Sequence, residues 1–307
     1  MSIMRIAFAV IRFEEPFRVG KAGLMDTLDY IPSDTVYSAL ENLNHLGISH
    51  GIDKVSSIYP MVFRENGRDS FTVPIPIDLK LKMLNSINKY ASNASDVHTV
   101  LKYIKKLKYM PLDCIHDSNV EMQKFNGQVK LRCSGREFIY IENYGSRISI
   151  QRNVIGRVLN SANTYRVAAF QPYVNYVFYF TVKEGVDLSK VRSSLEVLGK
   201  VGIGGERSIG LGYFTVVNIG YVDDLRDSGN NALLLGTALP SRQEVTGYVN
   251  FTVRSWICSN PFYVIGPVTV LTDGSVVSKG DLNFETLTGP NCIKKLDPLW
   301  LWYEASY

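Results

Sequence analysis

A run of fourteen residues from Gly199 to Gly212 contains six glycines, with Arg207 and Ser208 near its middle. Glycine allows the backbone to pass close to a ligand and to direct successive N–H groups at an anion. Arginine adds a positive charge, and a serine hydroxyl can hydrogen-bond to a phosphate or to a ribose 2′-OH. These residue types in this order favour the binding of a phosphate-bearing ligand.

The elements expected around this run decide which phosphate ligand it fits. A helix is predicted before the glycines, over Asp187–Leu198, and a strand after them, over Tyr213–Ile219. A dinucleotide-binding fingerprint needs the opposite order, with the helix N-terminus at the pyrophosphate. A Walker loop is excluded because the Gly-Lys-Ser or Gly-Lys-Thr that it requires does not occur. The purely structural alternative is a flexible connector, for which one or two glycines would be enough.

Positive charge is concentrated in the middle of the chain. Residues 121–166 hold eight basic and three acidic side chains, whereas the whole chain has a net charge of only +4. Residues 143–182 contain no acidic residue, and they contain four arginines: Arg147, Arg152, Arg157 and Arg166. An arginine fork without a neighbouring carboxylate suits a phosphate. Composition alone leaves two interpretations open, a nucleic-acid interface and a solvated basic face.

Histidines near the first predicted helix raise the alternative of a ribonuclease. Such an enzyme needs a general base near a 2′-OH and an acid for the leaving oxygen. His45 and His50 lie close to that helix, but a histidine at a helix end more often caps the end. His98 is expected in a loop among Ser and Asn.

The four cysteines are widely spaced and contain no Cys-x-x-Cys pair, and none of the four histidines forms a ligand pair at helical spacing with a cysteine. They are therefore expected to be reduced thiols in a cytoplasmic protein, and neither a metal site nor a cofactor is predicted. The residues concerned are Cys114, Cys133, Cys258 and Cys292.

The composition is that of a globular protein. Of the 307 residues, 46% are hydrophobic and 20% are charged, which excludes extensive disorder. The apolar runs are too short for a membrane-spanning helix. The length predicts two domains, because a domain usually has about 100–200 residues.

The order of elements in residues 1–220 predicts a β-α-β-β-α-β (ferredoxin-like) domain with an insertion at about 80–166. In its first helix, Ser33 or Asp34 is expected to accept hydrogen bonds from the first-turn N–H groups, and Gly47 to end the helix. The insertion is predicted to begin with one or two helices within Lys80–Tyr109. The predicted strands and helices of this domain are Arg5–Phe13, the helix from Pro32–Thr35 to Gly47, strand pieces in Gln128–Ile150, Tyr173–Val182, Asp187–Leu198 and Tyr213–Ile219.

A second, smaller and β-rich domain is predicted over 221–307, with a boundary near Gly220–Asn230, where Asp, Gly and Asn cluster. Its expected strands are Ala232–Leu239, Gly247–Trp256, Val268–Leu271 and Leu299–Tyr303.

The glycine-rich run between a helix and a strand resembles the signature of the RAMP superfamily of CRISPR-associated proteins. The part of the run that carries the likeness is Gly204–Gly212. Three further places are similar to the family's motifs: the loop Phe17–Gly20 with the helix start Pro32–Leu40, the basic hairpin segment Arg152–Arg157 continuing to Arg166, and the strand-turn-strand Leu271–Val277. The best fit is to the subunits that hold the 5′ tag of the guide RNA (crRNA) in type III-A (Csm) interference complexes, with type III-B and III-D relatives as alternatives.

This resemblance implies an α+β fold of two ferredoxin-like (RRM-like) domains and a non-catalytic role in antiviral defence. The subunit would grip the crRNA 5′ tag, cap the filament of backbone RAMP subunits and dock the large polymerase-like subunit, contacting target RNA only indirectly. The RNA-contacting residues that it implies are Gly202, Gly204, Gly205, Arg207, Ser208, Gly210 and Gly212 in the loop, Arg147, Arg152, Arg157 and Arg166 in the hairpin, and Arg18 and Lys21 beside the first helix. A RAMP-type endoribonuclease that processes the crRNA precursor is the alternative.

A third class is a protein that binds only other proteins. Trp300, Trp302, Tyr303 and Tyr307 form an aromatic tail, and tryptophan and tyrosine are enriched at protein interfaces. Core packing explains the same residues equally well.

Overall fold

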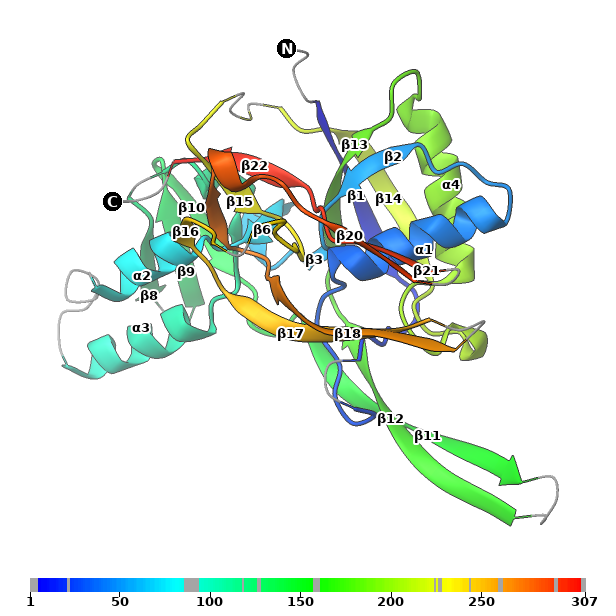
Figure 1. The fold of residues 1–307 in the computed structure, drawn as a ribbon. Coiled ribbons are helices and arrows are strands. Elements are labelled where there is room, and N and C mark those ends of the chain that lie inside the picture. The colour runs from blue at the N-terminus through cyan, green and yellow to red at the C-terminus, as the bar shows by residue number, and fades with distance from the viewer. Residues whose placement is uncertain are drawn as a thin grey trace.

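A computed structural model describes the chain at residues 5–20, 23–85, 94–117, 119–125, 128–156, 161–223, 225, 228–242, 244–258, 262–289 and 292–304. Its first unit is an antiparallel sheet in the order β14-β1-β13-β2, with β3 also paired to β13 (Figure 1). The strands are β1 (Ile6–Phe13), β2 (Ile52–Val55), β3 (Tyr59–Pro60), β13 (Tyr176–Val182) and β14 (Phe214–Tyr221). With α1 (Ser33–His45) and α4 (Leu188–Val201), the sheet has the connectivity of a β-α-β-β-α-β unit.

Strand β1 is apolar on both faces because both faces are covered. Side chains alternate across a strand, so Ala7, Ala9 and Ile11 face the opposite side from Ile6, Phe8 and Val10. The first set packs in a core with residues of α1 and α4. The second set packs with the insertion and with the C-terminal strands. Two separate cores therefore share this one strand.

The two helices of this unit begin in different ways. Asp187 caps α4, since its carboxylate accepts hydrogen bonds from the N–H groups of Ser189 and Lys190. At α1 the predicted cap is wrong: Pro32 precedes the helix, and no side chain caps it. Ser33 Oγ instead accepts a hydrogen bond from the Thr237 N–H at 2.9 Å, in the C-terminal part of the chain.

Asp34 has a similar long-range role. Its carboxylate is 1% exposed, accepts a hydrogen bond from Trp256 Nε1 at 2.5 Å and lies 3.2 Å from Arg254 Nη2. The residues expected to start the helix therefore tie it to the C-terminal part.

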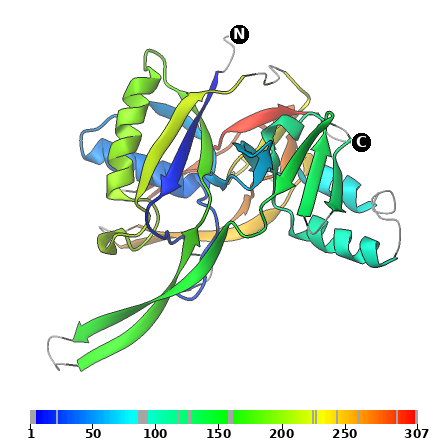
Figure 2. The ribbon, with the colours of Figure 1, turned by 180° about the vertical axis from the view of Figure 1, so that it is seen from behind.

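The insertion is larger than predicted, because it begins after β3 rather than near residue 80. Its sheet has the order β5-β4-β10-β9-β8, and α2 and α3 lie beside it (Figures 1 and 2). Its elements are β4 (Phe63–Glu65), β5 (Arg68–Ser70), β6 (Thr72–Pro74), α2 (Ile77–Asn85), α3 (Ala94–Lys106), β7 (Tyr109–Pro111), β8 (Glu121–Phe125), β9 (Gln128–Cys133) and β10 (Arg136–Tyr140). The helices expected in Lys80–Tyr109 are thus α2 and α3, and His98 lies in α3 rather than in a loop.

A long two-stranded hairpin ends the insertion. Strands β11 (Gly145–Gly156) and β12 (Ser161–Pro172) pair with each other from Gly145↔Pro172 to Gly156↔Ser161. The hairpin projects away from the rest of the chain in both ribbon views (Figures 1 and 2). Its base is anchored through pairing of Phe170 with Phe17 and a hydrogen bond from the Ala168 N–H to the Leu24 carbonyl.

The C-terminal part contains strands but no α-helix within its described residues, so a self-contained ferredoxin-like second domain is not what the structure describes. Its main sheet has the order β16-β19-β15-β22, and the inner side chains of this sheet share a core with the insertion. The elements are β15 (Asn231–Leu234), β16 (Gly247–Tyr248), β17 (Phe251–Cys258), β18 (Tyr263–Leu271), β19 (Val276–Ser278), β20 (Thr286–Gly289), β21 (Cys292–Lys295) and β22 (Trp300–Tyr303).

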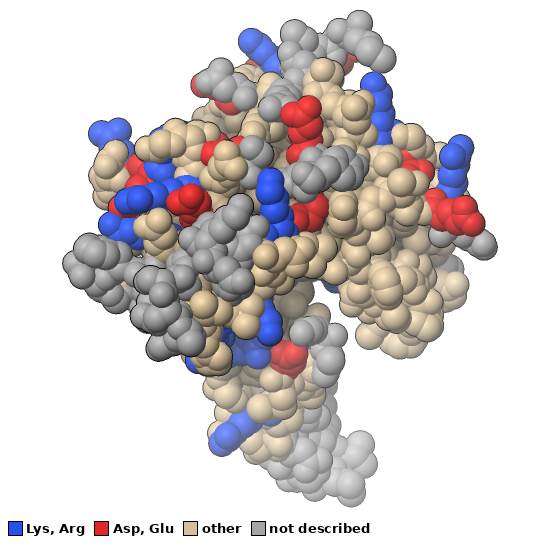
Figure 3. Space-filling model, turned by 90° about the vertical axis from the view of Figure 1, so that its left-hand side faces the viewer, with Lys and Arg blue, Asp and Glu red and all other residues tan. Residues whose placement is uncertain are grey.

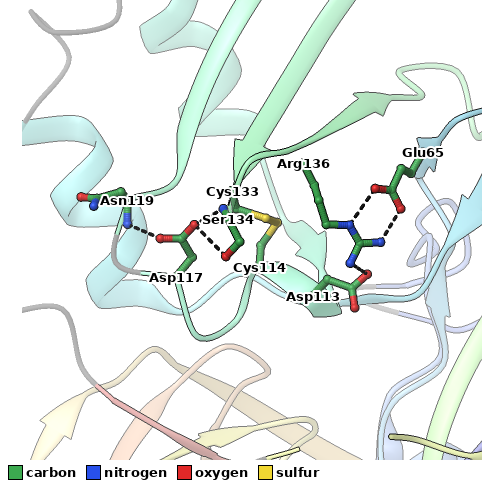
Figure 4. Close-up of a disulfide and its surroundings, with 8 residues drawn as sticks. All are labelled: Glu65, Asp113, Cys114, Asp117, Asn119, Cys133, Ser134 and Arg136. Atoms are coloured by element: carbon green, nitrogen blue, oxygen red, sulfur yellow. Dashed lines mark hydrogen bonds and ion pairs between the residues drawn. A yellow bond between two sulfur atoms is a disulfide. The ribbon is translucent and has the colours of Figure 1, made fainter. Parts of the chain in front are cut away.

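The expectation of four reduced thiols is wrong. Cys114 is bonded to Cys133 and Cys258 to Cys292. Figure 4 shows the first disulfide beside Arg136, which hydrogen-bonds to Glu65 and lies 3.1 Å from Asp113. The second joins the end of β17 to the start of β21 and so ties together two hairpins of the C-terminal part.

Among the described residues, no helix is both long and apolar enough to span a membrane.

Candidate nucleic-acid interface

The glycine-rich loop is shaped by a segment from near the start of the chain. The N–H groups of Gly205 and Gly212 donate to the carbonyls of Arg18 and Pro16, each at 2.8 Å. Within the loop, the Ile203 N–H donates to the Gly212 carbonyl at 3.0 Å. The loop is therefore a fixed structure, not a flexible connector between α4 and β14.

Two glycines are required by close approach of the backbone. A Cβ on Gly204 would lie 2.5 Å from the Arg18 carbonyl oxygen, and one on Gly212 would lie 2.0 Å from the Ile203 carbonyl oxygen. Both residues also have a positive φ, of 96° and 80°. The close approach is thus to the protein's own backbone.

This geometry corrects the roles expected for several loop glycines. The N–H groups of Gly202, Gly205, Gly210 and Gly212 all donate to protein carbonyls, so they are not available to bind phosphates. The glycines instead build the loop that presents Arg207 and Ser208, which lie in a short 3-10 turn (Arg207–Ile209). Ser208 is exposed and Arg207 is half-buried.

Arg207 has no ion pair within the described part of the chain, and the neighbouring Glu206 pairs elsewhere. Glu206 Oε2 lies 3.3 Å from Arg152 Nη1, on strand β11. This contact brings the outer half of strand β11 to the glycine-rich loop, so two segments that are far apart in the sequence form one surface. Glu206 takes up the charge of Arg152 and leaves that of Arg207 unneutralised.

The remaining predicted arginines lie in three settings. Arg147 Nη1 is 3.3 Å from Asp26 Oδ1, and the Arg147 side chain is 62% exposed. Arg166 is exposed and makes no ion pair with any described residue. The Arg18 guanidinium donates to the Gly23 carbonyl at 3.2 Å and so stabilises the loop before α1. Arg157 and Lys21 lie outside the described residues.

The register of the hairpin separates its arginines by face. Gln151 is paired with Arg166 and Arg152 with Tyr165, so Arg147 and Arg166 share one face while Arg152 lies on the other. Figure 3 shows Lys and Arg side chains along the projecting lower part of the molecule. One face of the hairpin therefore presents basic side chains to solvent, and the other contacts the loop.

A groove next to the loop contains residues that the sequence did not single out. It has a volume of about 1010 Å³ and lies between α1, the glycine-rich loop and the β20–β21 hairpin. Arg207 and Gly204 line one end, and Lys294, whose Nζ donates to Ser38 Oγ at 3.0 Å, lines a wall. Polar residues of α1 line it at helical spacing, namely Thr35, Ser38, Asn42 and His45, with Glu41 beside them. This spacing of polar residues is the sequence signal that could have identified the groove-lining face of α1.

The two histidines considered for catalysis differ in position. His50 is 1% exposed, accepts a hydrogen bond from the Ile52 N–H at Nδ1, and has its pKa lowered by burial and by Lys183. It is enclosed in the core and does not face the groove. His45 is exposed at the end of α1 and lines the groove with Arg207. Groups of His, Cys, Asp and Glu that could hold a metal ion do not occur among the described residues.

No protein-family model matches the chain, and no curated protein matches its sequence. Solved structures of the same fold do match. A chain in the crystal structure of a Csm1–Csm4 cassette with AMPPNP is 15% identical, with a TM-score of 0.57 and 98% of both chains covered. Chains in the cassette with cA4 (17% identical, TM-score 0.55) and with one ATP (15% identical, TM-score 0.53) also cover 98% of both chains.

These likenesses extend over nearly the whole chain, including the insertion and the C-terminal strands. At this level of identity they establish the fold. The chain accordingly shares the fold of the Csm4-like subunit in these Csm1–Csm4 cassettes.

Proposed function

We propose that this protein is a non-catalytic RNA-binding subunit of a type III CRISPR interference complex, and that it grips the 5′ tag of the crRNA. The observation that carries the proposal is the single surface formed by the glycine-rich loop and the hairpin, joined by the contact between Glu206 and Arg152. Arg207 and Ser208 on this surface, and Arg166 on the other face of the hairpin, are available to contact phosphates and 2′-OH groups.

The projecting hairpin supports a second part of the proposal. A ribbon that projects from the fold can reach the first guide nucleotides and bend them away from the target strand, while the loop holds the tag. Phosphate contacts would position the RNA, and base contacts would select the tag sequence.

The proposed protein partners are the large polymerase-like subunit and the backbone RAMP subunit, whose filament this chain would cap. The matched structures are cassettes of Csm1 with Csm4, which supports docking to a large subunit. The proposed setting is antiviral defence in the cytoplasm. Disulfides are uncommon in the cytoplasm, so four reduced cysteines in the native protein would support this location and two disulfides would speak against it.

The test mixes the purified chain with labelled RNA that carries the tag and guide, and with a scrambled-tag control. The same samples are run on a native gel and on a denaturing gel. The proposal predicts intact RNA that is shifted more strongly with the tag than with the scrambled sequence. Equal binding of both RNAs would contradict tag recognition.

The denaturing gel also tests the alternative of a crRNA-processing ribonuclease, which rests on the position of His45 in the groove. Cleavage at one site, lost in His45→Ala and retained in His98→Ala, would establish the nuclease. His98 is a matched control because it is exposed on α3, in the insertion, and does not line the groove.

A further inference from the structure

A second cavity lies where three parts of the chain meet, and none of the residues proposed to grip the tag lines it. Its volume is about 390 Å³. Tyr30 comes from the loop before α1, Lys80 and Lys108 from the insertion, and Arg254 and Asp273 from the C-terminal part. A cavity with apolar walls and a few converging polar groups is the usual form of a small-molecule site.

One wall of the cavity is aromatic and held in place. The Tyr59 hydroxyl donates to Asp273 Oδ1 at 2.6 Å, and the Tyr30 hydroxyl donates to Asp273 Oδ2 at 3.4 Å. The two rings are within 18° of parallel, and Tyr109 packs against Tyr59. Fixed aromatic rings provide a flat surface on which a nucleobase can stack, whatever its identity.

Another part of the lining has an excess of positive charge. Lys108 Nζ lies 2.6 Å from Asp29 Oδ2, so that charge is paired. Lys80 Nζ donates to the carbonyls of Lys105 and Leu107, at 3.0 and 2.7 Å, and has no carboxylate partner in the described part of the chain. An ammonium has three protons, which leaves one for a ligand. Burial and the nearby Lys108 lower the pKa of Lys80, and a bound anion would offset both effects.

Uncharged polar side chains complete the lining. Thr252 lies on β17 and Asn250 just before it, and both are exposed. Thr272 follows β18. Amide and hydroxyl groups of this kind hydrogen-bond to the edges of bases. The aromatic wall, the two lysines and the uncharged polar side chains together match the base, the phosphate and the base edge of a nucleotide.

We propose that this cavity binds a nucleoside monophosphate unit, with its base against Tyr30 and its phosphate at Lys80 and Lys108. The unit has two conceivable sources with the same chemistry: a free nucleotide, or a nucleotide of a bound RNA that is unstacked from its neighbours. The inference goes beyond tag gripping, because the cavity is separate from the glycine-rich loop and the hairpin.

The first arm of the test is calorimetric titration of the full chain with AMP, GMP, CMP, UMP and inorganic phosphate. Thr252→Trp places a large side chain at the exposed edge of the cavity and should abolish nucleotide binding. Lys80→Gln should weaken it about tenfold, the effect of losing one charge-assisted hydrogen bond. Lys190→Gln, which removes an exposed lysine from α4, is the control and should bind as the wild type does.

The second arm measures the affinity of the same variants for tag-bearing RNA. Binding of free nucleotides that is lost in Thr252→Trp supports a free-nucleotide site. Absence of that binding at millimolar nucleotide, with RNA affinity reduced in Thr252→Trp, supports an RNA nucleotide as the occupant.

The proposal is overturned if free nucleotides do not bind and RNA affinity is the same in Thr252→Trp and wild type. It is also overturned if nucleotides bind equally well to both. Thr252 is exposed, so this variant keeps the test valid even if Lys80→Gln disturbs the end of α3. Arg207→Ala separates the two proposals, because it should change RNA binding and leave mononucleotide binding unaltered.

Discussion

At the scale of single residues, backbone N–H groups of the glycine-rich loop form hydrogen bonds within the protein and are not left for a ligand. Four of its glycine N–H groups donate to protein carbonyls, and Glu206 is paired with Arg152. Arg207 and Ser208 are the side chains that this arrangement leaves for a ligand. Binding strength at the loop should therefore depend on charge at Arg207 more than on the number of glycines.

We predict that Arg207→Ala weakens binding of tag RNA and lowers the slope of log affinity against log salt by about 0.7–1, the value for one phosphate contact. Fluorescence anisotropy at several salt concentrations measures both quantities. Arg192→Ala is the matched control, since Arg192 pairs with Glu196 on the exposed face of α4. An unchanged slope in Arg207→Ala would remove this residue from the phosphate contacts.

Asp34 provides a second prediction at this scale, about stability. Asp34→Ala removes the partner of Arg254, whose side chain is only 19% exposed, and also the acceptor of the Trp256 N–H. Losing one partner of a buried ion pair costs about 3–5 kcal/mol. We expect a clearly lower midpoint in urea unfolding, followed by Trp fluorescence.

Asp34→Asn keeps an acceptor for Trp256 and should lose less stability than Asp34→Ala. Exposed Asp53→Ala, whose carboxylate is 3.7 Å from Lys295, is the control and should change the midpoint little. Equal stability of Asp34→Ala and wild type would show that the contact between α1 and β17 is not important for folding.

At the scale of elements, the hairpin can be separated from the fold. Ile150 is paired with Val167, so a two-residue Asn-Gly turn can replace residues 151–166 without changing the register of the remaining ladder. The described side chains in that segment are exposed or half-buried. The shortened protein should fold with a melting temperature close to that of the wild type.

The same variant should bind tag-and-guide RNA at least about tenfold more weakly, because it loses Arg152, Arg157 and Arg166. The measurement is a gel shift beside a melting curve. Arg152→Gln/Arg166→Gln, which changes charge but not length, distinguishes loss of charge from loss of reach. Wild-type affinity in the shortened protein would contradict a role of the hairpin in RNA binding.

Sequence patterns predicted three strands of the first sheet, β1, β13 and β14, and the two helices beside it, since each is a local pattern. Strands β2 and β3 were not predicted. Strand β1 alternates between two buried faces, α4 has a capping aspartate, and glycines mark the loop after it. The role of Asp34 could not be predicted, because a buried carboxylate beside a helix start has the same local sequence as a cap. Its partners, Trp256 and Arg254, are brought to it only by the tertiary fold.

The extent of the insertion was missed for a related reason. Its first strands, β4 and β5, are three residues each, too short for a clear period-two pattern. The cysteine pairs were likewise not predicted, because Cys114 lies in a 3-10 turn after β7 and Cys133 ends β9, and only the tertiary fold brings them together.

At the scale of the whole molecule, the two halves are not independent. Leu233, Leu235 and Leu301 of the C-terminal part share a core with Ile6 and Phe8 of β1. A fragment of residues 1–220 would expose this apolar face, so we predict that it aggregates or elutes as large species in size-exclusion chromatography. A monomeric, fully folded fragment would instead establish residues 1–220 as an autonomous domain.

The disulfides give a prediction that can be tested on the intact chain. They close loops with sequence separations of 19 and 34, and each is expected to stabilise the protein by about 3–4 kcal/mol. Reduction should therefore lower the melting temperature, by roughly 5 °C or more. The Cys258→Ser/Cys292→Ser variant should show part of this loss and a smaller further effect of reductant.

Thiol titration under denaturing conditions checks the premise of that prediction. Four reactive thiols in protein purified without reductant would show that the bonds are not formed.

The contacts of Gly205 with Arg18 and of Gly212 with Pro16 also determine when the loop can take its shape during synthesis. The carbonyl groups that shape it are made early, but the glycines that dock on them emerge only after the insertion and the hairpin. A nascent chain that ends at β13 would carry the hairpin arginines without the loop. Under the proposed function, RNA that reached such a chain would meet only a basic ribbon, and selective loading of a guide would wait until translation has passed Gly212.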